Sequence, residues 1–426
     1  MRVAPFGTAG SNLESTPFAY LVGHAMKSPE RPSPEPIGDK IRRLRDIRGY
    51  SVRHAAALAG ISHTQWGRIE KGQRSADNRF QLADIAQALK VSLSDLTGAA
   101  GLVAGDYAHT RTAVAQTMQA VIEADLEDPP LAEAVPMDLL TQRLELAQSL
   151  RFKCDYTGAS TVLPELLKGL HAASFGQDRT PALRGLVLAQ ETASFVVRYL
   201  GDPASAVMIA DRSRQAAAAL GDPVIMGLSA WTQAHAAAGC GLYPRAQRIA
   251  DRAVADLERA AGLPDAREML GQLLMVAAFT RYAQGDVGGA ASAVAEAERL
   301  AELTGQSAAL GLNFGPTNIR FWQVNMDADG ADPGRAVQIA RGVNPNDVPV
   351  VSRQAGFHID VARALANTGQ DQAAIRQFLM AERIAPQRVR MSPIVQETAR
   401  GMLERARRGT GWVELRGLCE RVGVGL

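Results

Sequence analysis

Basic side chains are concentrated in one short part of this 426-residue chain. Residues 37–98 hold eleven Lys or Arg and six Asp or Glu, a net charge of +5. Residues 1–36 hold three of each kind, and residues 99–426 carry a net charge of −3. A small basic unit joined to a large, slightly acidic one suits the neutralisation of phosphates at one end of the molecule. We therefore expect a nucleic-acid contact confined to residues 37–98.

The residue types that perform catalysis or bind metals form no recognisable set. Cys154, Cys240 and Cys419 lie far apart and make no CxxC or Cys/His spacing, which is typical of a reduced, cytoplasmic protein. His235 and His358 are single histidines in helical segments. Residues 309–315 superficially resemble a glycine-rich phosphate loop, but no strand precedes them and no lysine follows. We predict no catalytic site, metal or cofactor, so an enzyme in the C-terminal part is the weakest alternative.

The element that would position the basic residues is the stretch VRHAAALAGISHTQWGRI, from Val52 to Ile69. Two short helices fit it, joined by a turn at Gly60, where glycine can take a positive φ. Ala56 is small where the helices would cross, and Trp66 lies on one face of the second helix with Ile69. This spacing is typical of a DNA-binding helix-turn-helix.

The surrounding residues 37–98 predict five short amphipathic helices around one small core, with serine caps at Ser51, Ser62 and Ser92. The region resembles the Xre/Cro-type helix-turn-helix domain of phage repressors and many bacterial regulators. The matching features are LR-x-x-R-G, Ala56, Gly60, Ile61-Ser62, Ile69-Glu70, Gly72 and LADIAQALKVSLSDL. A basic five-helix bundle that binds protein instead is the alternative.

The resemblance implies roles for individual residues. Arg45 and Glu70 would form a structural ion pair. The residues expected to contact double-stranded DNA, as base readers or phosphate contacts, are Arg53, His63, Thr64, Gln65, Arg68, Arg74 and Arg79. Of these, Arg68 can reach guanine O6 and N7 with two hydrogen bonds, whereas Gln65 is better explained as a helix cap than as a base reader. Val52 stands where the family usually has glutamine, and Trp66 where it has Ile or Val, so Trp66 is either repacked into the core or on the surface.

A repeat pattern covers the larger C-terminal part. Gly, then Ala five residues on, then small or apolar residues nine and twelve on, recurs from Gly201, Gly241, Gly285 and Gly369, at intervals of 40, 44 and 84 residues. A further unit belongs in the widest gap, with residues 331–343 as its second helix. Glycine turns the chain between two helices, and alanine lets them approach closely. The region resembles tetratricopeptide-like repeats, and an irregular helical array is the fallback.

In such repeats the first helix of each pair lines the concave surface, and the resemblance places mixed aromatic and polar residues there. The predicted ligand-binding residues are Trp231, His235, Gln272, Phe279, Asn318, Trp322 and Asn325, with Glu191, Phe195, Arg198, Met275, Tyr282 and Arg363 at neighbouring positions. Such a surface suits a peptide or small molecule. Aromatic residues at helical spacing are more often part of the core, whereas buried amides must find partners. Asn318 and Asn325 are therefore the preferred ligand contacts.

Together these features predict an all-α chain of four parts: a disordered tail at 1–36, a DNA-binding domain at 37–98, a linker and connecting helix at 99–135, and a repeat domain at 136–426. Translation could begin at Met1 or Met26. No apolar run is long enough to span a membrane. The layout resembles peptide-sensing regulators of the RRNPP group, which implies a homodimer that binds two operator half-sites under ligand control. The alternative is a regulator whose repeats dock a partner protein and bind no small ligand.

Overall fold

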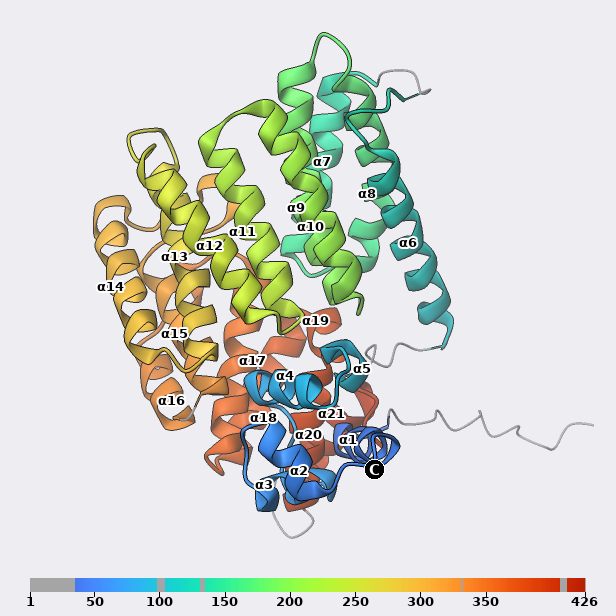
Figure 1. Cartoon of the computed structure of the whole chain (residues 1–426), viewed down its shortest axis with the longest axis vertical. Coiled ribbons are helices and arrows are strands. Elements are labelled where there is room, and N and C mark those ends of the chain that lie inside the picture. The colour runs from blue at the N-terminus through green and yellow to red at the C-terminus, as the bar shows by residue number, and fades with distance from the viewer. Residues whose placement is uncertain (1–34, 98–103, 131–134, 331, 407–411, 426) are drawn as a thin grey trace, which may run out of the picture. The chain divides into compact units, whose positions relative to one another are not determined.

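The computed structural model describes residues 35–97, 104–130, 135–330, 332–406 and 412–425 (Figure 1). Within these ranges the chain is helical, and its only β pairing is an isolated bridge between Ser307 and Phe314. The predicted all-α class is thereby confirmed. The predicted disordered tail, apart from its last two residues, and most of the glycine-rich joint after residue 97 lie outside the described residues. No helix in the described ranges is both long and apolar enough to cross a membrane.

Five short helices form the N-terminal domain, as predicted. They are α1 (Ile37–Ile47), α2 (Val52–Leu58), α3 (His63–Glu70), α4 (Arg79–Ala88) and α5 (Leu93–Thr97). Ser51 and Ser62 accept hydrogen bonds from backbone amides of the first turns of α2 and α3, which confirms both caps. Gly60 has a φ of 66°, so it makes the expected tight turn between these two helices. The apolar faces of the helices bury a core of their own.

Trp66 belongs to that core. Its side chain is fully buried, and its Nε1 donates a hydrogen bond of 2.6 Å to Glu70 Oε1. Arg45 donates to the same carboxylate through Nε and Nη2, at 2.6 and 3.0 Å. The predicted ion pair is confirmed, and the unusual tryptophan is the third member of this buried polar cluster. The cluster joins α1 to the end of α3 and so fixes the angle of α3 within the domain.

Most of the remaining helices form antiparallel hairpins (Figure 1). Their bounds are α6 (Ala104–Glu123), α7 (Met137–Phe152), α8 (Tyr156–Ala173), α9 (Arg179–Tyr199), α10 (Pro203–Leu220), α11 (Pro223–Gly239), α12 (Tyr243–Glu258), α13 (Ala266–Ala283), α14 (Val287–Thr304), α15 (Pro316–Asp329), α16 (Pro333–Arg341), α17 (Val351–Asn367), α18 (Asp371–Ile384), α19 (Pro386–Arg390), α20 (Pro393–Ala406) and α21 (Trp412–Arg421). Short 3₁₀ turns occur at Ala309–Gly311 and Pro345–Asp347.

The repeat pattern located the hairpins correctly. Gly201, Gly241, Gly285 and Gly369 all have positive φ and each lies between the two helices of a pair. The unit expected in the widest gap is the pair α15 and α16. In the four pairs that contain these glycines, the alanine five residues after the glycine is buried, which allows the close approach of the helices. The predicted succession of helical hairpins is therefore confirmed.

Two hydrophobic cores meet at α15. One core lies mainly between α6 and α15, takes Trp322 from α15 and also includes Ala355 of α17 and Met391. The other runs from α15 to the C-terminal helices and takes Phe321. Phe321 and Trp322, although adjacent in α15, thus pack into different cores on opposite sides of the helix. This arrangement leaves the faces of α11, α13, α15 and α17 close enough to line a common cavity, whose walls are described below.

Candidate DNA-binding face and ligand cavity

Helix α3 carries the exposed side chains expected to read bases. His63, Thr64 and Arg68 are exposed, and Gln65 is half-buried with its backbone amide bound to the Ser62 hydroxyl at 3.1 Å. Arg53 on α2 and Arg74 after α3 are also exposed. These positions can approach a duplex with hydrogen-bond donors for base edges and phosphates.

Arg79 lies in a different environment from the other predicted DNA contacts. Its guanidinium forms an ion pair with Asp329 of α15 and a longer one, of 3.4 Å, with Asp360 of α17. Its backbone amide donates to Asp329 Oδ1 at 2.9 Å, so this carboxylate also occupies the N-terminus of α4. In this arrangement Arg79 holds the N-terminal domain against the repeats.

Asp329 is shared between two arginines. Arg363 of α17, which is 1% exposed, forms an ion pair with Asp329 and donates to the backbone carbonyl of Asp77 at 2.6 Å. The Asp77 carboxylate accepts a hydrogen bond of 2.9 Å from Thr398 of α20. We call Arg79, Asp329, Arg363 and Asp77 the docking network. Together with Thr398, it ties Asp77 and the start of α4 to three separate helices of the repeats.

The charges of the docking network are balanced within the protein. Burial alone would raise the pKa of Asp329, but the positive charges of Arg363 and Arg79 outweigh burial and lower it to about 2. Asp329 is therefore ionised at neutral pH. Breaking such a buried pair leaves an uncompensated charge, which makes the network a strong determinant of how the domain docks.

Aromatic packing accompanies the ion pairs. The ring of Phe80, the second residue of α4, lies among those of Tyr243, Phe279 and Tyr282, with ring centroids 5.4 to 6.1 Å apart. Phe279 lies in α13 and belongs to the wall of the cavity. Phe80 therefore packs the N-terminal domain against a residue of the cavity wall.

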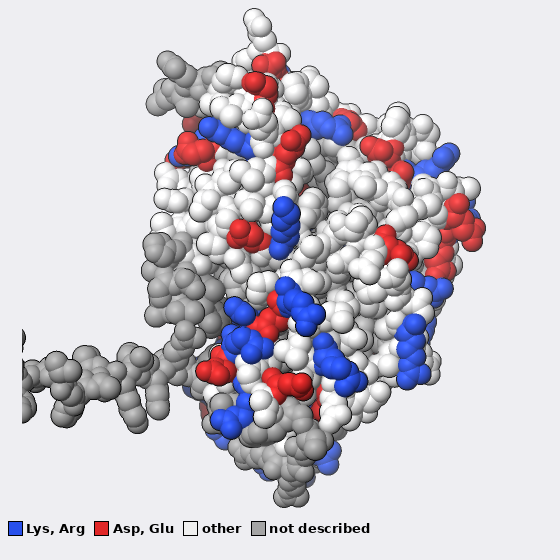
Figure 2. All heavy atoms as spheres, turned by 180° about the vertical axis from the view of Figure 1, so that it is seen from behind, with Lys and Arg blue, Asp and Glu red and all other residues white. Residues whose placement is uncertain are grey.

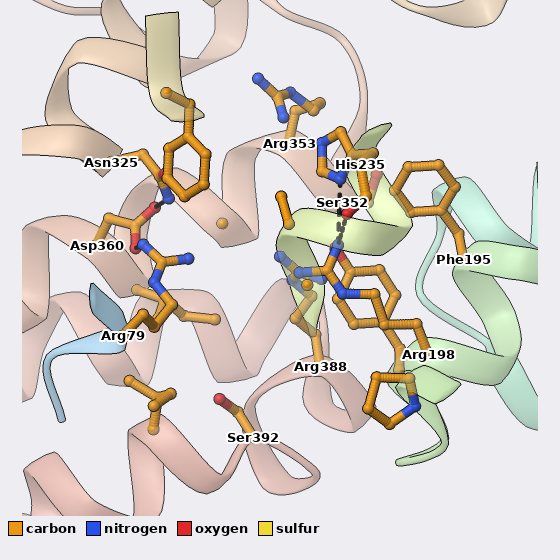
Figure 3. Close-up of a pocket in the computed structure, with 18 of the residues that line it drawn as sticks. Arg79, Phe195, Arg198, His235, Asn325, Ser352, Arg353, Asp360, Arg388 and Ser392 are labelled. Carbon is orange, nitrogen blue, oxygen red and sulfur yellow. Dashed lines mark hydrogen bonds and ion pairs between the residues drawn. The ribbon is translucent and has the colours of Figure 1, made fainter. Parts of the chain in front are cut away.

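A cavity of about 330 Å³ lies beside the docking network (Figure 3). Arg79, Leu82 and Leu93 of the N-terminal domain line it together with residues of the repeats. Figure 3 shows Arg79, Asp360 and Asn325 on one side, where Asn325 donates to Asp360 at 2.6 Å. Arg198, Arg388 and His235 lie on the other side. The cavity therefore separates the docking network from a second group of arginines.

The aromatic part of the cavity wall comes from four consecutive helical pairs. Phe195 of α9, Trp231 and His235 of α11, Phe279 of α13 and Trp322 of α15 form a continuous chain of rings, with neighbouring centroids 5.0 to 5.9 Å apart. This packing gives the cavity a broad apolar surface suited to the body of an organic ligand.

The polar part of the wall is basic. Arg151 pairs with Glu191 at 2.7 Å. Arg198 donates to His235 Nδ1 at 3.1 Å, and both Nε and Nη2 of Arg353 donate to Asn318. Arg388 lies over the ring of Tyr199, with its Cζ 4.0 Å from the centroid. These arginines project from segments far apart in the sequence towards one cavity.

Burial and the positive charge of the cavity lower the pKa of two basic groups that line it. Burial lowers the pKa of His235 well below its usual range, and the charges of Arg198, Arg353 and Arg388 lower it further. His235 is therefore neutral at physiological pH. Because arginine cannot accept, His235 Nδ1 is the acceptor of the Arg198 hydrogen bond, which leaves the ring proton on Nε2. Burial, with the nearby Arg388, lowers the pKa of Arg353 to about 10.

Most of the predicted ligand contacts meet at this cavity. Six of them line it: Trp231, His235, Gln272, Phe279, Trp322 and Asn325. Gln272 also donates to the Leu312 carbonyl at 2.8 Å and so positions the loop before α15. Asn318 is not among the lining residues, and its buried amide serves Arg353 instead. Sequence reasoning thus identified the aromatic side of the cavity.

The arginines of the cavity were largely missed. Arg198 was placed at a concave position, but Arg151, Arg353 and Arg388 were not singled out. The repeat pattern carried no signal for Arg388, because it belongs to the short α19 outside the predicted units.

On the face seen in Figure 2, acidic and basic side chains are interspersed, so the surface there shows no comparable concentration of one charge.

Residues 36–97 match the family described as "Helix-turn-helix domain", and no curated protein is significantly similar to the chain. Among solved structures, the chain is similar to aspartyl phosphate phosphatase F from Bacillus subtilis, with 15% identity, a TM-score of 0.44, and 85% of this chain and 96% of that chain covered. It is also similar to PlcR from Bacillus thuringiensis in complex with the peptide PapR7 and DNA, with 15% identity, a TM-score of 0.30, and 63% and 95% covered. These values are too low to transfer the activity or ligand of either protein. The matched family identifies residues 36–97 as a helix-turn-helix domain, the DNA-binding part of a transcription regulator.

Proposed function

We propose that this protein is a sequence-specific transcription regulator whose DNA binding is controlled by a ligand in the cavity. The helix-turn-helix match and the exposed donors on α3 support operator recognition. Because one such domain reads few base pairs, we propose a homodimer on two half-sites about 34 Å apart. The ligand would be a peptide or a small signalling molecule.

The observation that carries ligand control is the shared cavity wall. Arg79 of α4 belongs both to this wall and to the docking network. A ligand in the cavity would therefore contact the element that holds the DNA-binding domain. A ligand shifts the equilibrium between two arrangements of the domains only if it binds one arrangement more tightly than the other. A ligand that contacts both domains would have such a difference in affinity. Ligand binding would change how α4 docks, and hence the spacing of the two recognition helices.

Genome-wide binding with an Arg68→Ala variant tests the DNA-reading part of this proposal. Loss of one bidentate contact to guanine should cost about 1–3 kcal/mol, or roughly five- to 150-fold in affinity for specific sites. Arg248→Ala, an exposed substitution on α12, is the matched control. Equal occupancy by wild type and Arg68→Ala would refute direct readout by this residue.

A ligand screen distinguishes ligand control from the docking-scaffold alternative. Thermal unfolding of the full chain with small molecules and short peptides should reveal compounds that stabilise it and that change its affinity for DNA. A scaffold that only binds partner proteins should show no such stabilisation. Sedimentation of the full chain with operator DNA measures whether two copies bind together.

A further inference from the structure

Three arginines at the cavity have no carboxylate partner. Among the described residues, Arg198, Arg353 and Arg388 form no ion pair with Asp or Glu. Arg198 donates to His235, Arg353 donates to Asn318 and lies over the Trp322 ring, and Arg388 lies over the Tyr199 ring. Uncompensated positive charge in a partly buried site is unfavourable, because each guanidinium repels the others and has lost hydration. A negatively charged occupant would offset both effects.

The cavity also contains buried donors without acceptors. The Nε1 atoms of Trp231 and Trp322 have no hydrogen-bond partner, although both side chains are only 6% exposed. Nε and Nη1 of Arg388 and Nε of Arg151 likewise lack partners. Each of these groups can donate and none can accept. Buried polar groups in native proteins are almost always satisfied, so this set indicates an occupant rich in acceptor oxygens.

The shape and lining restrict the rest of the ligand. A volume of about 330 Å³ lies at the lower end of the usual range for small-molecule sites, roughly 300–1,000 Å³. The chain of rings from Phe195 to Trp322 provides apolar and aromatic surface beside the arginines, since Arg198 donates to His235 and Arg353 lies over the Trp322 ring. A compact body with one anionic head group fits these properties.

We infer that the cavity binds a small organic anion, with a carboxylate or phosphate head held by Arg198, Arg353 and Arg388 and an apolar body against the aromatic wall. This inference rests on the proposed ligand control and specifies its chemistry. The head group accepts from the arginines, and the indole N–H groups supply further donors at the edge of the aromatic wall. The anion would lie between the arginines and the docking network.

Matched probe pairs test the charge requirement. We would measure binding to the full chain by calorimetry for 3-phenylpropionate against its amide, phenyl phosphate against phenol, and N-acetylphenylalanine against its amide. The third pair represents the carboxylate of a peptide C-terminus, so the pairs separate the possible sources of the anion. At least one anion should bind about tenfold more tightly than its neutral partner.

Arginine variants test the location. Arg388→Met and Arg198→Met should weaken anion binding about tenfold while changing binding of the neutral partner little. Arg388→Lys should retain part of the affinity, and Arg248→Met, on the exposed surface of α12, should retain all of it. Circular dichroism and the melting temperature of each variant show whether it remains folded.

The outcomes separate this inference from ligand control of DNA binding. Equal binding of anion and neutral partner, no binding of any anion at millimolar concentration, or unchanged anion affinity in folded Arg388→Met would overturn the inference. If an anion binds as expected but DNA affinity does not change, the cavity assignment stands and ligand control is wrong. If only neutral compounds bind and they change DNA affinity, ligand control stands and the anionic assignment is wrong.

Discussion

The docking network and the cavity use arginine in opposite ways, although they share one wall. Arg363 and Arg79 both pair with Asp329, so their charges are neutralised within the protein. Arg198 and Arg388 have no such partner among the described residues. A paired arginine stabilises one arrangement of the chain, whereas an unpaired arginine is available to form an ion pair with a bound ligand. The comparison therefore separates a structural charge cluster from a candidate binding site.

The boundary between the two regions explains how they could communicate. Asp360 accepts from Asn325 at 2.6 Å and forms a longer pair with Arg79, so it belongs to the cavity wall and contacts the docking network. An anion near these side chains would compete with Asp360 for positive charge. Docking of the DNA-binding domain and binding of the anion would then be coupled, because each would change the free energy of the other.

Replacing Arg363 should have the largest effect on stability. Arg363→Met leaves Asp329 with one cation instead of two and removes the hydrogen bond to the Asp77 carbonyl. We expect the free energy of unfolding to fall by about 3–5 kcal/mol, as for other broken buried pairs. Urea denaturation measures it, with Arg248→Met as the exposed control. A loss below about 1 kcal/mol would contradict a structural role for this pair.

Acid should weaken the docking network in a defined pH range. The pKa of Asp329 is about 2 in the folded protein, below its ordinary value of 3.8. A depressed carboxyl pKa adds stability above the ordinary value, here about 2 kcal/mol, which is lost as the pH falls from about 4 to 2. Unfolding free energies measured over this range should show a smaller slope in Asp329→Asn. Identical pH profiles would exclude this contribution of Asp329.

Salt dependence distinguishes the exposed arginines from the docked one. Arg53→Ala and Arg74→Ala should each reduce the slope of log affinity against log salt concentration by about 0.9, because each loses one phosphate contact. Arg79→Ala should leave the slope unchanged, since its guanidinium is paired with Asp329. Titrations of a labelled duplex at several salt concentrations measure the slopes. A reduced slope for Arg79→Ala would return this residue to the DNA-binding face.

Removing an unpaired arginine should have the smallest effect. Arg388→Met loses its contact with the Tyr199 ring but also relieves repulsion from neighbouring arginines. We expect the ligand-free protein to change in stability by less than about 1 kcal/mol. Urea denaturation beside Arg363→Met provides the direct comparison. A loss as large as that of Arg363→Met would show that Arg388 is structural.

The sequence predicted those features of the fold that depend only on neighbouring residues. The caps at Ser51 and Ser62, the turn at Gly60 and the repeat glycines depend on a few neighbouring residues, so the sequence contained enough information to locate them. The aromatic side of the cavity followed from helical spacing within each repeat. These are the parts of the fold and site that could be read from the chain.

The side-chain contacts that could not be predicted are mainly those between residues far apart in the sequence. Arg79 begins a helix in a basic domain, which indicates a phosphate contact, but its partner Asp329 lies 250 residues away. Arg388 reaches the cavity from α19, which the repeat pattern did not include. The place of Trp66 stayed open because Ile or Val is usual at its position, and its burial and its hydrogen bond to Glu70 put it in the core. The contacts of Arg79 and Arg388, in contrast, depended on which distant segments the fold brings together.

Reciprocal binding tests the central claim most directly. DNA affinity of the full chain would be measured with and without a saturating anion from the matched pairs, and anion affinity with and without saturating operator DNA. We predict that each ligand changes the affinity of the other by the same factor, about fivefold or more. DNA affinity that is identical with the cavity filled and empty, together with anion affinity unchanged by DNA, would contradict control of this helix-turn-helix domain through the cavity.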